Sequence, residues 1–118
     1  MIEQGAADAF VADWIAAWNA RDLDAVLDHY ADDIVFWSPR IKIVTGRDIA
    51  CVEGKPALEA YWSKAMEDAP ELRFTLQRVY VGSEAITIAY ANHRGENAAE
   101  TLVFDRHGRV KLAVATYR

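Results

Sequence analysis

The chain has 118 residues, of which 53% are hydrophobic and 26% are charged, and its net charge is -5. This length gives one domain, and this composition excludes an intrinsically disordered or low-complexity chain. The negative charge would repel nucleic acid and anionic membrane surfaces on average, so neither is expected as a partner. We therefore expect a single compact domain over residues 1–118.

The sequence also bears on the compartment. No run of about 18 apolar residues could span a bilayer, and the first residues lack the basic and then apolar pattern of a signal peptide. The single Cys51 cannot form an internal disulfide. These features predict a cytoplasmic protein.

The first third of the chain has helical periodicity. Phe10, Trp14 and Trp18 recur at a spacing of four residues, which places them on one face of a helix over residues 6–20. Asp22 is a good N-cap residue, and the apolar stripe that follows it predicts a short second helix.

The middle of the chain contains a strand and a third helix. Residues 34–37 are β-branched or aromatic and predict a short strand, which Pro39 ends. Residues 40–44 alternate polar with apolar side chains, but the pattern from there to residue 52 is the weakest in the chain. Pro56 then opens a third helix, because its missing N–H costs nothing in the first turn.

The rest of the chain is predicted to form strands joined by hairpin signals, at residues 72–81, 85–92, 98–105 and 110–117. Helices followed by a meander of strands indicate an α+β domain. We expect helices on one face of a strongly bent antiparallel sheet.

Glu100 is the candidate functional residue of the strand over residues 98–105. At a period of two, it shares a face with Leu102 and Phe104. Desolvation would raise the pKa of a carboxyl group on such an apolar wall, and groups of this kind are frequent at functional sites. The alternative is that Glu100 lies at the solvent rim or pairs with an arginine.

The last predicted strand indicates open space in the interior. It places Ala113, Ala115 and Tyr117 on one face. Two alanines in the middle of a strand leave room beside them. This space could form a cavity covered by large aromatic side chains of the helices. The alternative is that the tryptophans of the predicted helices fill it.

Four segments carry a resemblance to a known family, namely WNARDLD at 18–24, YADD at 30–33, GKPAL at 54–58 and FDRHGRV at 104–110. With the apolar strand that ends at Ser38-Pro39, they resemble the nuclear transport factor two-like superfamily. That superfamily includes SnoaL-like cyclases, ketosteroid isomerases and limonene epoxide hydrolases, and the resemblance covers essentially the whole chain. It implies a cone in which a curved sheet wraps around three helices, a mostly apolar pocket at the open end, and a homodimer formed through the sheets.

The ketosteroid isomerase branch has three catalytic positions that can be compared with this chain one at a time. Its general base falls on Ser38, its oxyanion-hole tyrosine on Trp14 and its second acid on Glu100. Of the three positions, only Glu100 retains the same type of functional group, a carboxyl group. Loss of the base removes a proton transfer that contributes roughly 10²- to 10⁴-fold, so the resemblance argues against steroid isomerisation by the known route.

The resemblance also implies which residues face the pocket, because the position of Glu100 faces it in this fold. The other expected pocket residues are Trp14, Trp18, Trp37, Ser38, Tyr61, Trp62, Leu102, Ala113, Ala115 and Tyr117. For each aromatic residue, core packing is the alternative. The histidines and Cys51 lack metal-ligand spacing, and no phosphate loop or dinucleotide fingerprint occurs, so neither a metal nor a cofactor is expected.

We expect a hydrophobic small molecule as the partner. If the protein is catalytic, Glu100 is expected to act as a cofactor-independent general acid or base in isomerase, lyase or hydratase chemistry. Two other classes of function stay open. One is a non-catalytic carrier or sensor that uses the same pocket, and the other is a dimeric association module whose cone is filled and whose sheet face is the working surface.

Overall fold

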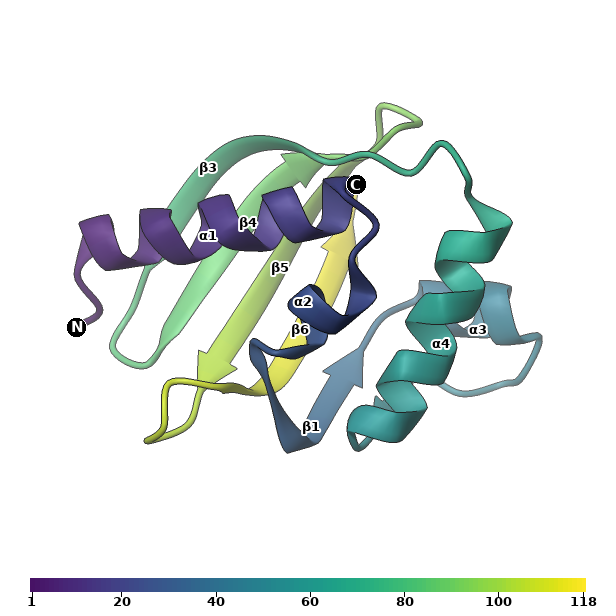
Figure 1. Cartoon of the computed structure of the whole chain (residues 1–118), viewed down its shortest axis with the longest axis horizontal. Coiled ribbons are helices and arrows are strands. Elements are labelled where there is room, and N and C mark those ends of the chain that lie inside the picture. The colour runs from purple at the N-terminus through teal and green to yellow at the C-terminus, as the bar shows by residue number, and fades with distance from the viewer.

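Six strands form one curved sheet in the computed structural model, which describes residues 1–118 (Figure 1). They are β1 (Tyr30–Trp37), β2 (Cys51–Glu53), β3 (Thr75–Val81), β4 (Ala85–Ala91), β5 (Asn97–Phe104) and β6 (Val110–Tyr117). Their order across the sheet is β2-β1-β6-β5-β4-β3. The sheet is not closed, because β2 and β3 each have one neighbour.

The sheet is antiparallel except at one place. The strands from β3 to β6 form a meander of hairpins, whereas β1 pairs in parallel with β6. Within that pair, Phe36 lies opposite Ala113 and Trp37 opposite Val114. Hairpin signals identify only strands that follow one another in sequence, so this parallel pairing carries no comparable local signal.

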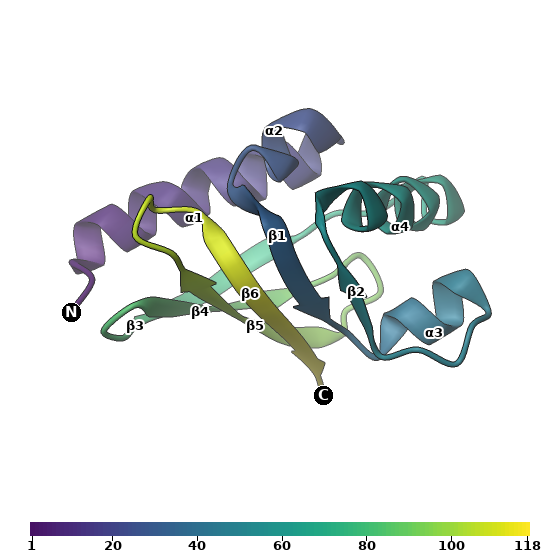
Figure 2. The same ribbon diagram turned by 90° about the horizontal axis from the view of Figure 1, so that it is seen from below.

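Four helices accompany the sheet, namely α1 (Gln4–Asn19), α2 (Leu23–Leu27), α3 (Arg40–Thr45) and α4 (Lys55–Asp68). Figure 2 shows α1, α2 and α4 on one side of the curved sheet and α3 beyond the edge formed by β2. The α+β architecture with helices on one face is therefore the expected one. None of these helices is both long enough and apolar enough to cross a membrane.

The helix α3 is an addition to the three helices predicted from the sequence. Only Ile41 is buried in it, and the helix is capped at its C-terminus by Gly46, which has a left-handed backbone conformation with φ of 70°. A six-residue helix with a single buried side chain has no repeating apolar stripe. The alternating polar and apolar side chains of residues 40–44 therefore did not predict this helix, which contributes residues to the site described below.

Local sequence accounts for the other helices. Ala7, Val11, Trp14 and Trp18 are buried at spacings of three and four residues along α1. The carboxylate of Asp22 caps α2 by accepting a hydrogen bond from the backbone N–H of Ala25 at 3.1 Å. Helix α4 begins directly after Gly54 and carries a proline in its first turn, as predicted.

The inner face of the sheet follows the expected period of two. In β5, Ala98, Glu100 and Leu102 are buried, and the residues between them are partly exposed. In β6, Ala113 and Ala115 are buried on the same side. Glu100 therefore lies under the helices, among apolar side chains.

Candidate functional site

A cavity of about 180 Å³ lies inside the cone and opens to solvent. It is bounded by α3, α4, the inner face of the sheet and the segments 69–74 and 92–94. Twelve of its 18 lining residues are hydrophobic, including Trp18, Phe36, Tyr61, Trp62, Leu72 and Phe74. Polar groups lie among them, contributed by Arg40, Asp68, Asn92, His93, Arg94 and Glu100. A largely apolar cavity with a few polar groups has the composition of a small-molecule site.

Glu100 is the buried carboxyl group of this cavity, with 5% of its surface exposed. The hydroxyl of Tyr90 on β4 donates a hydrogen bond to Oε1 of Glu100 at 2.6 Å, and Oε2 has no partner. Burial raises the pKa of Glu100 to about 7, although the bond from Tyr90 lowers it in part. Near neutral pH the group is therefore able to take up or release a proton.

Buried phenol groups surround this carboxyl group. Burial raises the pKa of four tyrosines, and the charge of Glu100 raises each of these pKa values further. They are Tyr30, Tyr61, Tyr90 and Tyr117. Their hydroxyls therefore stay protonated at neutral pH, and the hydroxyl of Tyr90 donates its hydrogen bond to Glu100. Tyr30 in turn accepts a hydrogen bond from Nε1 of Trp14 at 3.0 Å, deep in the core.

The side chain of Arg40 covers the edge of the cavity beside Tyr117. Its guanidinium carbon lies 4.6 Å from the centroid of the Tyr117 ring, and Nη2 lies 2.5 Å from Oε1 of Glu96. The backbone N–H of Arg40 donates to Oγ of Ser38 at 3.2 Å. The short helix α3 thus places a paired arginine at the edge of an otherwise aromatic wall.

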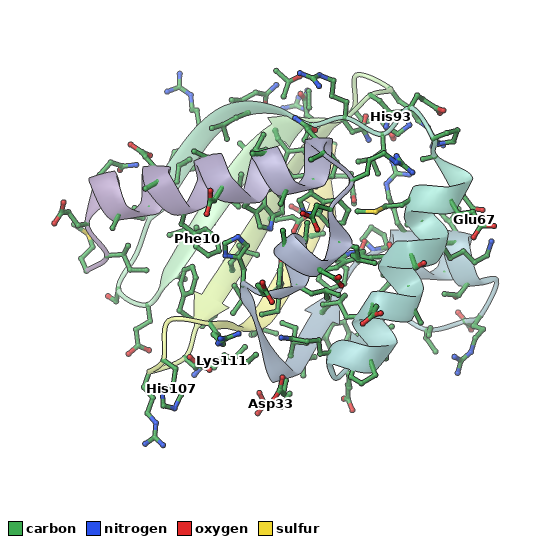
Figure 3. All side chains as sticks on the ribbon, viewed as in Figure 1. Phe10, Asp33, Glu67, His93, His107 and Lys111 are labelled. Carbon is green, nitrogen blue, oxygen red and sulfur yellow. The ribbon has the colours of Figure 1, made fainter.

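The unsatisfied polar groups of the protein gather around the same cavity. Four buried side-chain polar atoms lack a hydrogen-bond partner, namely Nε1 of Trp18, both ring nitrogens of His93 and Oε2 of Glu100. All three residues line the cavity. Figure 3 shows His93 in the turn that follows β4, whereas Glu67 on α4 points away from the interior. Buried polar atoms normally have partners, so these four atoms are exceptions, and all of them belong to residues that line one cavity.

The structure brings together five of the residues expected in the pocket, namely Trp18, Tyr61, Trp62, Glu100 and Tyr117. The other expected residues do not line the cavity. Trp14, Leu102, Ala113 and Ala115 are buried in the core, and Ser38 is buried next to Arg40. Trp37 is 44% exposed on the outer face of the sheet, since the adjacent Phe36 points inward.

Several lining residues were absent from the sequence-based set. Tyr90 lies in an alternating strand with Ile86 and Ile88, so its face could have been predicted. Its contact with Glu100 depends on the register between β4 and β5, which has no local signal. His93 and Arg94 lie in a hairpin turn, where polar residues are ordinary. No three or more His, Cys, Asp or Glu side chains lie close enough together to hold a metal ion.

Comparison with known proteins decides the family. Residues 11–114 match the SnoaL-like domain. The chain belongs to the SnoaL-like family. A SnoaL-like protein of unknown function from Burkholderia thailandensis E264 is 37% identical to it, with a TM-score of 0.92 over 100% of this chain and 99% of that chain. None of the curated proteins matches the sequence significantly.

More distant structures share the SnoaL-like fold alone. A Methylobium petroleophilum PM1 protein of unknown function with a cystatin-like fold has a TM-score of 0.76 and 16% identity, over 98% of this chain and 78% of that chain. A candidate isomerase of the SnoaL-like family from Agrobacterium tumefaciens C58 has a TM-score of 0.73 and 16% identity, over 95% of this chain and 97% of that chain. The predicted α+β cone fold and the predicted family are thus confirmed.

Proposed function

We propose that this SnoaL-like protein binds a small, mostly apolar molecule in the cavity, and that Glu100 acts on it as a general acid or base without a cofactor. One observation carries the proposal. The carboxyl group of Glu100 is buried at an apolar cavity, with one oxygen held by Tyr90 and the other without a partner. The free oxygen can exchange a proton with a ligand while the bonded one fixes the orientation of the group.

The arrangement suits proton transfer next to a carbonyl group. The carboxylate of Glu100 takes a proton from the carbon beside the ligand carbonyl, and the electron pair moves onto the carbonyl oxygen to form an enolate. The unpartnered N–H of Trp18 is the donor available to that oxygen. A fixed donor in a site that excludes water stabilises such a charge more strongly than water would.

The fate of the proton decides the reaction class. Isomerisation results when Glu100 returns the proton to a different carbon and the double bond shifts. Elimination results when the proton goes to a hydroxyl group on the β carbon, which leaves as water, and hydration is the reverse. These are the isomerase, lyase and hydratase reactions, and one of the distant structural relatives is described as a candidate isomerase.

The test is hydrogen exchange on a panel of small cyclic ketones in deuterated water. With the wild-type protein, we expect one or more ketones to incorporate deuterium at the carbon beside the carbonyl, and NMR measures this incorporation. In Glu100→Gln, the incorporation should be abolished while the ligand still binds. Glu67→Gln is the matched control, because Glu67 is an exposed carboxylate on α4. Exchange that survives Glu100→Gln would contradict the assignment. Ligands that raise the melting temperature without exchanging would assign a carrier or sensor instead.

The proposal includes a second copy of the chain as partner and the cytoplasm as the setting. Trp37 is 44% exposed and Val114 is 36% exposed, and the two are neighbours in register on the outer face of β1 and β6. Exposed large apolar side chains side by side favour association through this face. Cys51 is a free thiol, which is usual for proteins in a reducing compartment.

A further inference from the structure

We infer that the ligand of this cavity is a carboxylate of about one ring in size, with its anionic group at the mouth beside His93 and Arg94. This inference rests on the proposed function and names the chemical class of its ligand. It follows from the volume of the cavity, from the pairing of the charges that line it and from the geometry of the turn that carries these two residues.

The volume limits the ligand to about one ring. The cavity measures about 180 Å³. An engineered apolar cavity of about 150 Å³ in another protein binds benzene, so this one accepts a six-membered ring with small substituents. Trp18, Trp62 and Phe74 supply flat apolar walls for such a ring. A compound of three or four fused rings exceeds the space.

The charges at the mouth leave one cation without a partner. Arg40 is paired with Glu96, and Asp68 is paired with Lys64 through both of its carboxylate oxygens. The guanidinium group of Arg94 has no carboxylate oxygen within 4.0 Å and no hydrogen bond, although the residue lines the cavity and its charge helps to lower the pKa of Glu96. Arg94 is therefore the lining cation that is free to bind an anion, and the carboxylate of Glu71, near His93, is the nearby negative charge that such an anion has to avoid.

The imidazole ring of His93 lies beside this free cation. Its side chain is 12% exposed, and neither ring nitrogen has a hydrogen-bond partner. Nε2 lies 3.6 Å from a carboxylate oxygen of Glu71, which is beyond hydrogen-bond distance. A ring N–H in this place lacks the acceptor that buried donors normally have, and a ligand carboxylate supplies one.

The turn that carries the two residues is held in place before any ligand binds. Oδ1 of Asn92 accepts hydrogen bonds from the backbone N–H groups of Arg94 at 2.9 Å and Glu96 at 3.0 Å. Nδ2 of Asn92 donates to Oε1 of Glu96, the same oxygen that Arg40 contacts. Arg94 and His93 are thus presented by a bonded turn, which reduces the entropy lost when a ligand binds.

These features fix the orientation of the ligand. Its carboxylate lies at the mouth and its ring lies between the aromatic walls. A polar substituent on the far side of the ring then meets the free oxygen of Glu100 or the N–H of Trp18.

The probes are 4-hydroxybenzoate and its neutral analogue 4-hydroxybenzamide, with binding measured by calorimetry at neutral pH. We expect the acid to bind about tenfold more tightly than the amide, the ratio that a charge-assisted hydrogen bond gives. Arg94→Gln should bring this ratio close to one, because the acid loses more affinity than the amide when the cation is removed. Arg106→Gln, in the hairpin between β5 and β6, is the matched control and should keep the ratio of the wild type.

Any other binding result would contradict either the inferred ligand class or the proposed function. Equal binding of acid and amide, or a ratio that Arg94→Gln leaves unchanged, would overturn the carboxylate inference and leave the proposed function standing. If neither probe binds but the neutral two-ring compound 2-naphthol does, the size and charge assignments are wrong and the cavity still binds ligands. If 2-naphthol also fails to bind, the proposed function falls with the inference.

Discussion

The hydroxyl group of Tyr90 lies 2.6 Å from Oε1 of Glu100, and both side chains are buried on the inner face of the sheet. They come from adjacent strands. Glu100 pairs with Ile88 and Tyr90 pairs with Ala98, so the contact is diagonal across the ladder. The bond holds one oxygen of the carboxyl group, and the other oxygen stays available in the cavity.

Removal of that bond should shift the titration of Glu100 upward. The hydrogen bond from Tyr90 lowers the pKa of Glu100 against the larger effect of burial. Tyr90→Phe should therefore raise the pKa of Glu100 further, as measured by NMR of the labelled carboxyl carbon. Tyr80→Phe is the control, because Tyr80 is 56% exposed. A pKa of Glu100 that falls or stays constant in Tyr90→Phe would refute the role of this bond.

The folded protein should lose stability as Glu100 ionises. Its pKa is 4.5 ordinarily and about 7 in the folded state, so between these pH values the folded protein binds more protons than the unfolded chain. Its contribution to the free energy of unfolding therefore decreases as the pH rises from 4.5 to 7, by up to about 3 kcal/mol. Below this window the carboxyl group is neutral in both states, and above it the loss is complete.

Urea unfolding of Glu100→Gln at several pH values tests this dependence. Relative to the wild type, the variant should gain up to about 3 kcal/mol between pH 4 and pH 8, because glutamine does not ionise. Glu67→Gln, an exposed position, should show no comparable gain. Parallel stability curves for the wild type and Glu100→Gln would be inconsistent with a raised pKa.

Some of this site could be predicted from the sequence. The period of two placed Glu100 with Leu102 on one face, and the helical stripe placed Trp18 toward the sheet. The choice between Phe36 and Trp37 had no such signal, because residues 34–37 are all apolar and the side that is buried depends on the parallel pairing of β1 with β6. The partner of Glu100 likewise depends on strand register, which is a property of the assembled sheet.

The junction between α1 and α2 should contribute to stability through Arg21. Its guanidinium group donates hydrogen bonds to the carbonyl oxygens of Met66, Ala69 and Pro70 at the end of α4. Its backbone has a left-handed conformation with φ of 58°. Arg21→Ala should lower the free energy of unfolding by about 1–3 kcal/mol, because these hydrogen bonds involve a charged donor.

A glycine variant at position 21 distinguishes the contribution of the side-chain hydrogen bonds to stability from that of the backbone conformation. Arg21→Gly loses the same hydrogen bonds but relieves the cost of a left-handed residue that carries a Cβ, about 1 kcal/mol. Urea unfolding should therefore find Arg21→Gly more stable than Arg21→Ala. The reverse order would mean that the backbone at residue 21 is not strained.

Association through the outer sheet face predicts a change in oligomeric state. Trp37→Lys places a charge beside Val114 on that face, so a dimer of the wild type should dissociate to monomers in sedimentation experiments. Ile43→Lys is the control, because Ile43 is 73% exposed on α3 and lies away from this face. A monomeric wild type, or a Trp37→Lys variant that stays dimeric, would rule out this interface.

The titration of Glu100 itself is the most direct test of the account. Its carboxyl carbon can be labelled, assigned by comparison with Glu100→Gln, and followed by NMR from pH 3 to pH 9 in the folded protein. Burial at the cavity predicts a pKa of about 7. A pKa near the ordinary 4.5 would show a solvated or ion-paired carboxylate, and Glu100 would then have no role as an acid or base at neutral pH.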